Sequence, residues 1–82
     1  MFPVRILEDE GIADYLAKRQ LTAQFAKAKR MILSGNNSGA LLRKREPAEL
    51  GMWYFRINKK YRAIGPINQD GAMIVTEIDD HQ

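Results

Sequence analysis

The spacing of the apolar residues changes near residue 40, and this change constrains the fold more than any other feature of the sequence. Before it, apolar residues recur at helical spacing: Leu21, Phe25, Ala28 and Ile32. After it they occupy every second position, as in Met52–Ile57. A period near 3.6 indicates an amphipathic helix, and a period of two indicates a half-buried strand. We therefore expect an α+β fold with Leu21, Phe25 and Ile32 in its core.

The expected elements follow one another in the order β-α-α-β-β-β-β. The apolar run Phe2–Leu7 predicts the first strand, and a helical hairpin with a break near Arg19-Gln20 follows it. Ser34-Gly35-Asn36-Asn37 ends the second helix, because Gly35 or Asn36 can take the left-handed cap conformation. The later strands are expected at Ala40–Arg45, Met52–Ile57, Tyr61–Ile64 and Met73–Ile78. The N-terminal strand and the helical hairpin would then pack on a mainly antiparallel sheet.

Two turn signals separate the last three expected strands. Asn58-Lys59-Lys60 predicts a hairpin loop, and Asn68-Gln69-Asp70-Gly71 is a strong turn signal. Gly65-Pro66 follows the strand between them. Because proline cannot donate a hydrogen bond to a sheet, we expect that strand to be short or bent at this point.

Length and composition exclude several classes of protein. Eighty-two residues correspond to one domain, 1–82. With no cysteine and one histidine, neither a disulfide framework nor a metal site is expected, and no cofactor is expected either. The N-terminus has no long apolar run, so a signal peptide and a membrane span are not expected. The expected location is the cytoplasm.

Basic residues are concentrated in the middle of the chain. The net charge is +2 over residues 1–40, +5 over residues 41–66 and −4 over residues 67–82. The basic segment also holds four aromatic residues: Trp53, Tyr54, Phe55 and Tyr61. Cations interleaved with aromatic rings suit a polyanion that offers bases for stacking. A solvated, lysine-rich sheet edge would give the same pattern. Trp53 and Tyr61 are expected to pack in the core or across strands.

Two segments of the second half resemble a known family. Phe55–Arg62, which reads FRINKKYR, resembles the R-I-N-x-x-Y-R hairpin of HigB-like toxins in the RelE superfamily. Val75–His81, which reads VTEIDDH, is similar to the closing strand of the same toxins, which often ends V-x-I-x-D-x-H. The resemblance covers residues 52–82. One position departs from it, because Asp80 stands where these toxins commonly have a tyrosine.

The resemblance implies a RelE-like fold and the toxin of a toxin–antitoxin module. Such a toxin is a metal-independent endoribonuclease (an mRNA interferase) that inhibits translation. Its implied partners are mRNA on the ribosome and a cognate antitoxin protein, with no membrane involved. Three other interpretations stay open. The chain could be a ParE-like toxin that inhibits DNA gyrase, a catalytically inactive RelE-fold binding protein, or an interaction protein unrelated to toxins.

Cleavage of RNA without a metal needs positive charge around the pentacovalent phosphorus, and arginines can supply it. If Asn58-Lys59-Lys60 is a three-residue loop, Arg56 lies opposite Arg62 and both side chains leave the same face. A two-residue loop would set Arg62 opposite Ile57 instead. By resemblance, both arginines match basic residues of the family's active site. The alternative for either arginine is a surface ion pair with Glu77, Asp79 or Asp80.

Three further residues complete the catalytic candidates: Tyr54, Asp79 and His81. His81 is the only side chain whose unperturbed pKa, about 6.5, lies near neutrality. By resemblance it takes the place of a catalytic histidine or arginine, and a general acid or base there would promote proton transfer. Tyr54 shares a face with Arg56 and could stack a base or help that transfer. Asp79 or Asp80 could orient His81 or an arginine.

The expected RNA-binding residues are Arg43, Lys44, Arg45, Lys59 and Lys60. On a strand, Arg43 and Arg45 would share one face and Lys44 would take the other. These positions suit contacts to phosphates of rRNA or mRNA, although a solvated basic run is the common alternative.

Overall fold

The chain folds into two helices and six strands within the part that the computed structural model describes, residues 3–35 and 42–80. The elements are β1 (Arg5–Glu8), α1 (Ile12–Lys18), α2 (Thr22–Leu33), β2 (Arg43–Lys44), β3 (Met52–Arg56), β4 (Tyr61–Pro66), β5 (Ala72–Val75) and β6 (Glu77–Asp80). A short 3-10 helix, Ala48–Leu50, lies between β2 and β3. The expected α+β class is confirmed. No helix in this part of the chain is long and apolar enough to cross a membrane.

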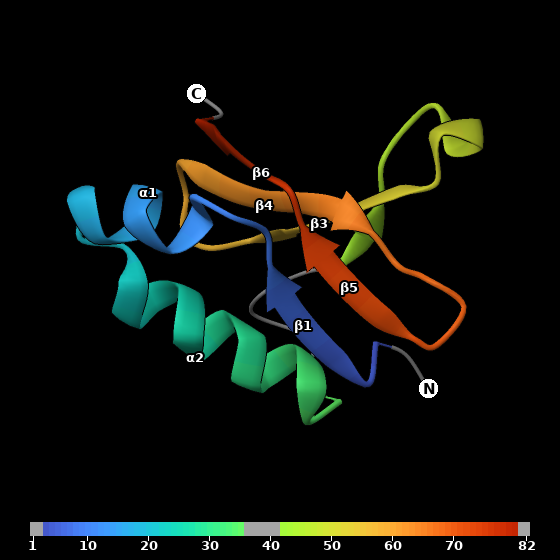
Figure 1. Ribbon diagram of the computed structural model, residues 1–82, viewed down its shortest axis with the longest axis horizontal. Coiled ribbons are helices and arrows are strands. Elements are labelled where there is room, and N and C mark those ends of the chain that lie inside the picture. The colour runs from blue at the N-terminus through green and yellow to red at the C-terminus, as the bar shows by residue number, and fades with distance from the viewer. Residues whose placement is uncertain (1–2, 36–41, 81–82) are drawn as a thin grey trace.

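The described strands form two sheets rather than the one that the sequence predicts. β1 pairs in parallel with β5, and β2, β3, β4 and β6 form an antiparallel sheet in that order. The helices lie together on one side of the strands (Figure 1). The prediction of a single last strand, Met73–Ile78, is wrong. Thr76 separates β5 from β6, and at that residue the chain changes its partner from β1 to β4.

The first two predicted strands are also shorter or displaced. The first was expected at Phe2–Leu7, and within the described residues it runs over Arg5–Glu8. The second was expected at Ala40–Arg45, and its described part is Arg43–Lys44. In the loop that follows, Gly51 ends the 3-10 helix with a left-handed φ of 67°.

A β-bulge joins the two sheets. Ile67 bridges Met73, whereas Ile64 pairs with Glu77. Two residues of β4 therefore face three residues of the opposing chain, which is the residue count of a bulge. A Cβ atom on Gly65 would lie 1.8 Å from the carbonyl oxygen of Ile74, a distance that excludes any side chain. Glycine at this position is thus what allows the two backbones to come together.

The sequence predicts that β4 is short or bent at Gly65-Pro66. It is not short, because the strand continues through both residues. Pro66 lies opposite Met52 of β3. Ile57 donates its N–H to the Tyr61 carbonyl at 2.9 Å, and hydrogen-bonded pairs alternate with non-bonded pairs in an antiparallel ladder. Counting from that pair, Met52 and Pro66 form a non-bonded pair. Pro66 would therefore donate no hydrogen bond to β3 even if it had an N–H, and the pairing of β3 with β4 is not weakened. The missing donor lies on the other edge of β4, where the opposing chain forms the bulge.

The helical hairpin turns at Gln20, as the sequence predicts. The N–H of Leu21 donates to the Leu16 carbonyl at 2.8 Å, and that of Gln20 donates to the Ala17 carbonyl at 3.1 Å. This pair of bonds is a Schellman motif, and Gln20 takes the left-handed φ of 58° that it requires. Leu16 and Leu21 are both buried in the core. The expected cap of α2 is also found, since Gly35 has a φ of 87°; Asn36 lies outside the described residues.

The core lies between the helical hairpin and the strands. Phe25 of α2 meets Phe55 of β3, with ring centroids 5.8 Å apart. The burial of Leu21, Phe25 and Ile32 confirms the predicted core. Trp53 and Tyr61 are partly buried against it, as expected. The side of β3 that carries Phe55 and Ile57 therefore faces the helices, and the opposite side of the sheet is available for function.

Gly65→Ala should destabilise the protein by about 3 kcal/mol or more, because the new methyl group must displace the Ile74 backbone. Urea unfolding of the purified variant measures the change. Gly51→Ala is the matched control: its φ is 67° and nothing lies within 4 Å of the added Cβ, so only backbone strain of about 1–2 kcal/mol is expected. Equal costs for the two variants would contradict the role given to Gly65.

Candidate functional site

Two arginines lie directly opposite each other on β3 and β4. Arg56 pairs with Arg62, and the Ile57 N–H donates to the Tyr61 carbonyl. The loop Asn58-Lys59-Lys60 therefore has three residues, and the expectation that both arginines share a face is confirmed. They form a non-bonded pair, in which the Cα atoms approach to about 4.5 Å. Because Phe55 and Ile57 are buried toward the helices, both guanidinium groups leave the far side of the sheet.

Three more candidates join the two arginines on this side. Asp79 of β6 lies opposite Arg62, so a cross-strand row runs from Arg56 through Arg62 to Asp79. Tyr54 lies two residues before Arg56 on β3, and Arg43 of β2 lies opposite Tyr54. We call the surface formed by Arg43, Tyr54, Arg56, Arg62 and Asp79 the arginine face.

The charge of the arginine face is not neutralised within the described residues. It combines three guanidinium groups with the carboxylate of Asp79, and Glu77 of β6, which lies opposite Ile64, adds a second carboxylate to the same side of the sheet. Over residues 3–35 and 42–80, neither Arg56 nor Arg62 forms a salt bridge, so the alternative ion pairs with Glu77, Asp79 or Asp80 are not formed there. Like charges directly opposite each other on a sheet repel. A bound anion would remove that repulsion, and two guanidinium groups can clamp one phosphate.

Tyr54 supports Arg62. The guanidinium carbon of Arg62 lies 5.0 Å from the centroid of the Tyr54 ring, which is within the range of a cation–π contact. Both side chains are half-buried. The contact restricts the flexible arginine before any ligand binds, and such preorganisation is what makes electrostatic stabilisation effective.

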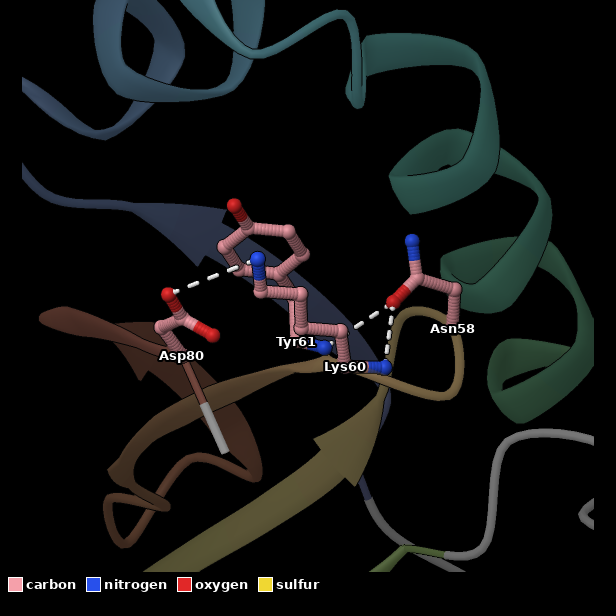
Figure 2. Close-up of polar contacts among 4 residues, drawn as sticks. All are labelled: Asn58, Lys60, Tyr61 and Asp80. Atoms are coloured by element: carbon pink, nitrogen blue, oxygen red, sulfur yellow. Dashed lines mark hydrogen bonds and ion pairs between the residues drawn. The ribbon is translucent and has the colours of Figure 1, made fainter. Parts of the chain in front are cut away.

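Asn58 fixes the loop between the arginines (Figure 2). Its Oδ1 accepts hydrogen bonds from the backbone N–H groups of Lys60 at 2.8 Å and Tyr61 at 2.9 Å. Its Nδ2 donates to Oε1 of Gln24 on α2 at 2.7 Å. The side chain therefore sets the loop conformation and ties the loop to the helical hairpin. Because the three-residue loop sets the register, Asn58 also determines that Arg56 faces Arg62.

The remaining basic candidates do not gather on the arginine face. Lys60 turns to the helix side, where its Nζ lies 3.8 Å from Oδ2 of Asp80 (Figure 2). Lys44 also takes the opposite side from Arg43, with its Nζ 5.7 Å from the centroid of the Trp53 ring. Lys59 is exposed in the loop. Of the five predicted RNA-binding residues, Arg43 lies on the arginine face, and Arg45 follows it two positions later.

The three C-terminal candidates have different outcomes. Asp79 lies beside Arg62, where it can orient that guanidinium group. Asp80, expected as a possible partner of an arginine, is paired with Lys60 on the other side of the sheet. His81 lies outside the described residues. Its assignment as a candidate therefore remains a prediction from the sequence.

Sequence reasoning missed the roles of Asn58 and Gln24. For Asn58 there was a signal, since asparagine at the start of a short loop commonly accepts bonds from the backbone two or three residues later. Gln24 gave none: it is one polar residue among several on α2. Its role depends on the tertiary contact alone.

A cavity of about 350 Å³ lies elsewhere, between the two helices and β1. Its lining is mainly apolar and includes Leu16, Phe25 and Leu33, but no residue of the arginine face. Within the described parts of the chain, no group of three His, Cys, Asp or Glu side chains is placed to hold a metal ion. The cations of the arginine face are the side chains best placed to bind an anionic ligand.

No family model matches the chain, and no curated protein matches it either.

Asn58→Ala should destabilise the protein by about 1–2 kcal/mol, because two backbone N–H groups lose their acceptor and α2 loses its tie to the loop. Urea unfolding measures the loss. Gln24→Ala is the matched control, since it removes the hydrogen bond between the loop and α2 and keeps the bonds within the turn. It should lower the free energy of unfolding by less. If the two variants were equally stable, the turn would not depend on the Asn58 carbonyl.

Proposed function

We propose that this chain is a RelE-like toxin of the HigB type, which cleaves mRNA on the ribosome as a metal-independent endoribonuclease and thereby inhibits translation. The observation that carries the proposal is the opposed pair Arg56 and Arg62, unpaired with any carboxylate in the described parts of the chain. The same two residues flank the hairpin motif on which the resemblance to this toxin family rests.

The chemistry that suits this pair is attack of a ribose 2′-oxygen on the adjacent phosphorus. A bond forms between the 2′-oxygen and phosphorus, and the bond from phosphorus to the 5′-oxygen breaks. The products are a 2′,3′-cyclic phosphate and a 5′-hydroxyl. Negative charge builds up on the non-bridging oxygens during the reaction. Arg56 and Arg62 would bind these oxygens, and such fixed cations are commonly the largest single contribution to catalysis.

The reaction also needs two proton transfers: a base must take the proton of the 2′-hydroxyl, and an acid must give a proton to the departing 5′-oxygen. Tyr54 offers a hydroxyl beside Arg62 on the arginine face. His81 is a second candidate, assigned by sequence, because its unperturbed pKa of about 6.5 suits both directions of transfer. Asp79 lies opposite Arg62 and has no assigned part in the proton transfer.

The proposal has consequences for partners and location. A toxin of this kind acts in the cytoplasm and is silenced by a cognate antitoxin protein. It differs from a ParE-like toxin in its target, which is RNA rather than DNA gyrase. The uncompensated cations of the arginine face favour the RNA target, because phosphate contacts dominate the affinity of proteins for nucleic acids.

Induced expression of the wild-type chain in a bacterial host should arrest growth and create new in-frame mRNA 5′ ends. Arg62→Ala should lower the yield of these ends by about 10²–10³-fold, because it removes one of two cations at the developing charge. Mapping of mRNA 5′ ends is the measurement. Arg5→Ala, which removes an exposed arginine from β1, is the control and should cleave like the wild type.

Each outcome of this experiment bears on the proposal. Growth arrest with intact mRNA would favour the gyrase-inhibiting branch. A folded protein that causes no arrest would favour the inactive binding protein. If Arg62→Ala produced the same cuts as the wild type, the arginine pair would not be the catalytic site.

His81→Ala should lower the cleavage rate by about 10²-fold or more with the fold intact, because it removes the general acid or base. Single-turnover cleavage measures the rate, and circular dichroism checks the fold. Between pH 5 and 8 the wild-type rate should follow a group with a pKa near that of histidine, and the variant should lose that dependence. A variant with the wild-type rate would remove His81 from the mechanism.

A further inference from the structure

The β3–β4 loop and the turn between α1 and α2 lie toward the same end of the molecule (Figure 1). The surface of these two segments carries four exposed cations: Lys18, Arg19, Lys59 and Lys60. We call this surface the basic end. The sequence places the first two in the helical half, for which no function is predicted.

The Asn58–Gln24 hydrogen bond brings the two segments together. It joins the loop that carries Lys59 and Lys60 to Gln24 over 2.7 Å. Gln24 lies in the first turn of α2, and Lys18 and Arg19 lie at the C-terminal end of α1, the helix before it. The hydrogen bond therefore joins the loop between Arg56 and Arg62 to the start of the helix that follows Lys18 and Arg19.

Two of these cations are held over aromatic rings. The guanidinium carbon of Arg19 lies 3.6 Å from the centroid of the Tyr15 ring, and the Lys60 Nζ lies 5.5 Å from that of the Tyr61 ring. The left-handed Gln20 directly after Arg19 fixes the backbone there as well. Arg19 is thus oriented before binding, in the same way that Arg62 is oriented on Tyr54.

The basic end is only partly neutralised. Asp80 pairs with Lys60 at 3.8 Å, and it is the one carboxylate that bonds a cation of the basic end within the described residues. Asp14 lies one helical turn before Lys18, but in that part of the chain the two form no salt bridge. The C-terminal end of the α1 dipole favours Lys18 and Arg19, but it does not explain Lys59 on a different segment.

We propose that the basic end binds the phosphate backbone of the RNA strand that the arginine face cleaves. This inference rests on the proposed function. Lys59 lies in the loop between Arg56 and Arg62, so a strand held by these arginines can pass Lys59 and reach Arg19 and Lys18 on the helical hairpin. The contacts are to phosphates, which are present at every nucleotide, so this surface adds affinity without choosing a sequence.

The test is binding of a fluorescein-labelled 2′-O-methyl oligoadenylate, which has no 2′-hydroxyl and so cannot be cleaved. Anisotropy titrations at several KCl concentrations between about 50 and 200 mM give the affinity and its salt dependence. The double variant Lys18→Gln/Arg19→Gln should bind about tenfold more weakly at the low-salt end. The slope of the logarithm of the binding constant against the logarithm of the KCl concentration should decrease in magnitude by about 1.4. Each phosphate contact with a single strand contributes about 0.7 to this slope, and the variant loses two contacts.

Arg5→Gln/Arg30→Gln is the matched control, because it removes the same charge from exposed positions on β1 and the last turn of α2. It should keep nearly the wild-type affinity. An equal loss in the control would overturn the proposal, since net charge rather than position would then set the affinity.

Two other outcomes separate this inference from the function on which it rests. If Lys18→Gln/Arg19→Gln binds like the wild type while Arg62→Ala binds weakly, the basic end is not a binding surface but the arginine face remains one. If the wild-type chain does not bind the oligonucleotide, the inference fails together with RNA recognition by the arginine face.

Discussion

The close contact between Gly65 and the Ile74 carbonyl is the constraint on which the rest of the structure depends. It permits a bulge in which three residues oppose two, and the register of β4 and β6 follows from that extra residue. Without it, Arg62 would face Ile78 and Asp79 would turn toward the helices, because a one-residue slip exchanges the two faces of a strand. The bulge thus keeps Ile78 with the core and places Asp79 beside Arg62.

The arginine face is therefore the product of two registers that are set independently. The bulge places Asp79, and the Asn58 turn places Arg56 opposite Arg62. Neither Gly65 nor Asn58, the residues that set these registers, is proposed to contact the substrate. The cations themselves repel one another, so the energy that holds them together comes from the core beneath, where Phe55 and Ala63 pair across the same two strands.

The sequence predicts well what local periodicity and turn chemistry determine. The helical hairpin with its break at Gln20, the core residues of α2 and the sharing of a face by Arg56 and Arg62 all follow from short-range patterns. The expectation that Arg62 lies opposite Arg56 nevertheless depends on the loop having three residues, and periodicity alone does not give the length of a loop. The hydrogen bonds of Asn58 in the turn fix that length.

What the sequence does not predict depends on which strands meet. The segment Met73–Ile78 reads as one strand and gives no sign that it changes partner at Thr76. Proline does not end the strand at Pro66. The sequence does not show toward which neighbouring strand the N–H of that position would point, and here it points away from β3. The link between the loop that carries Lys59 and the helical hairpin that carries Lys18 and Arg19 is likewise a tertiary effect, and it rests on the hydrogen bond between Asn58 and Gln24.

The central claim is that two opposed guanidinium groups promote attack by the 2′-hydroxyl of RNA. The most direct test is the chemical identity of the ends produced when purified wild-type protein cuts mRNA on ribosomes. The mechanism predicts 5′-hydroxyl ends together with 2′,3′-cyclic phosphates. Ends with a 5′-phosphate and a 3′-hydroxyl would require attack by water from the opposite side of the phosphorus and would contradict the account.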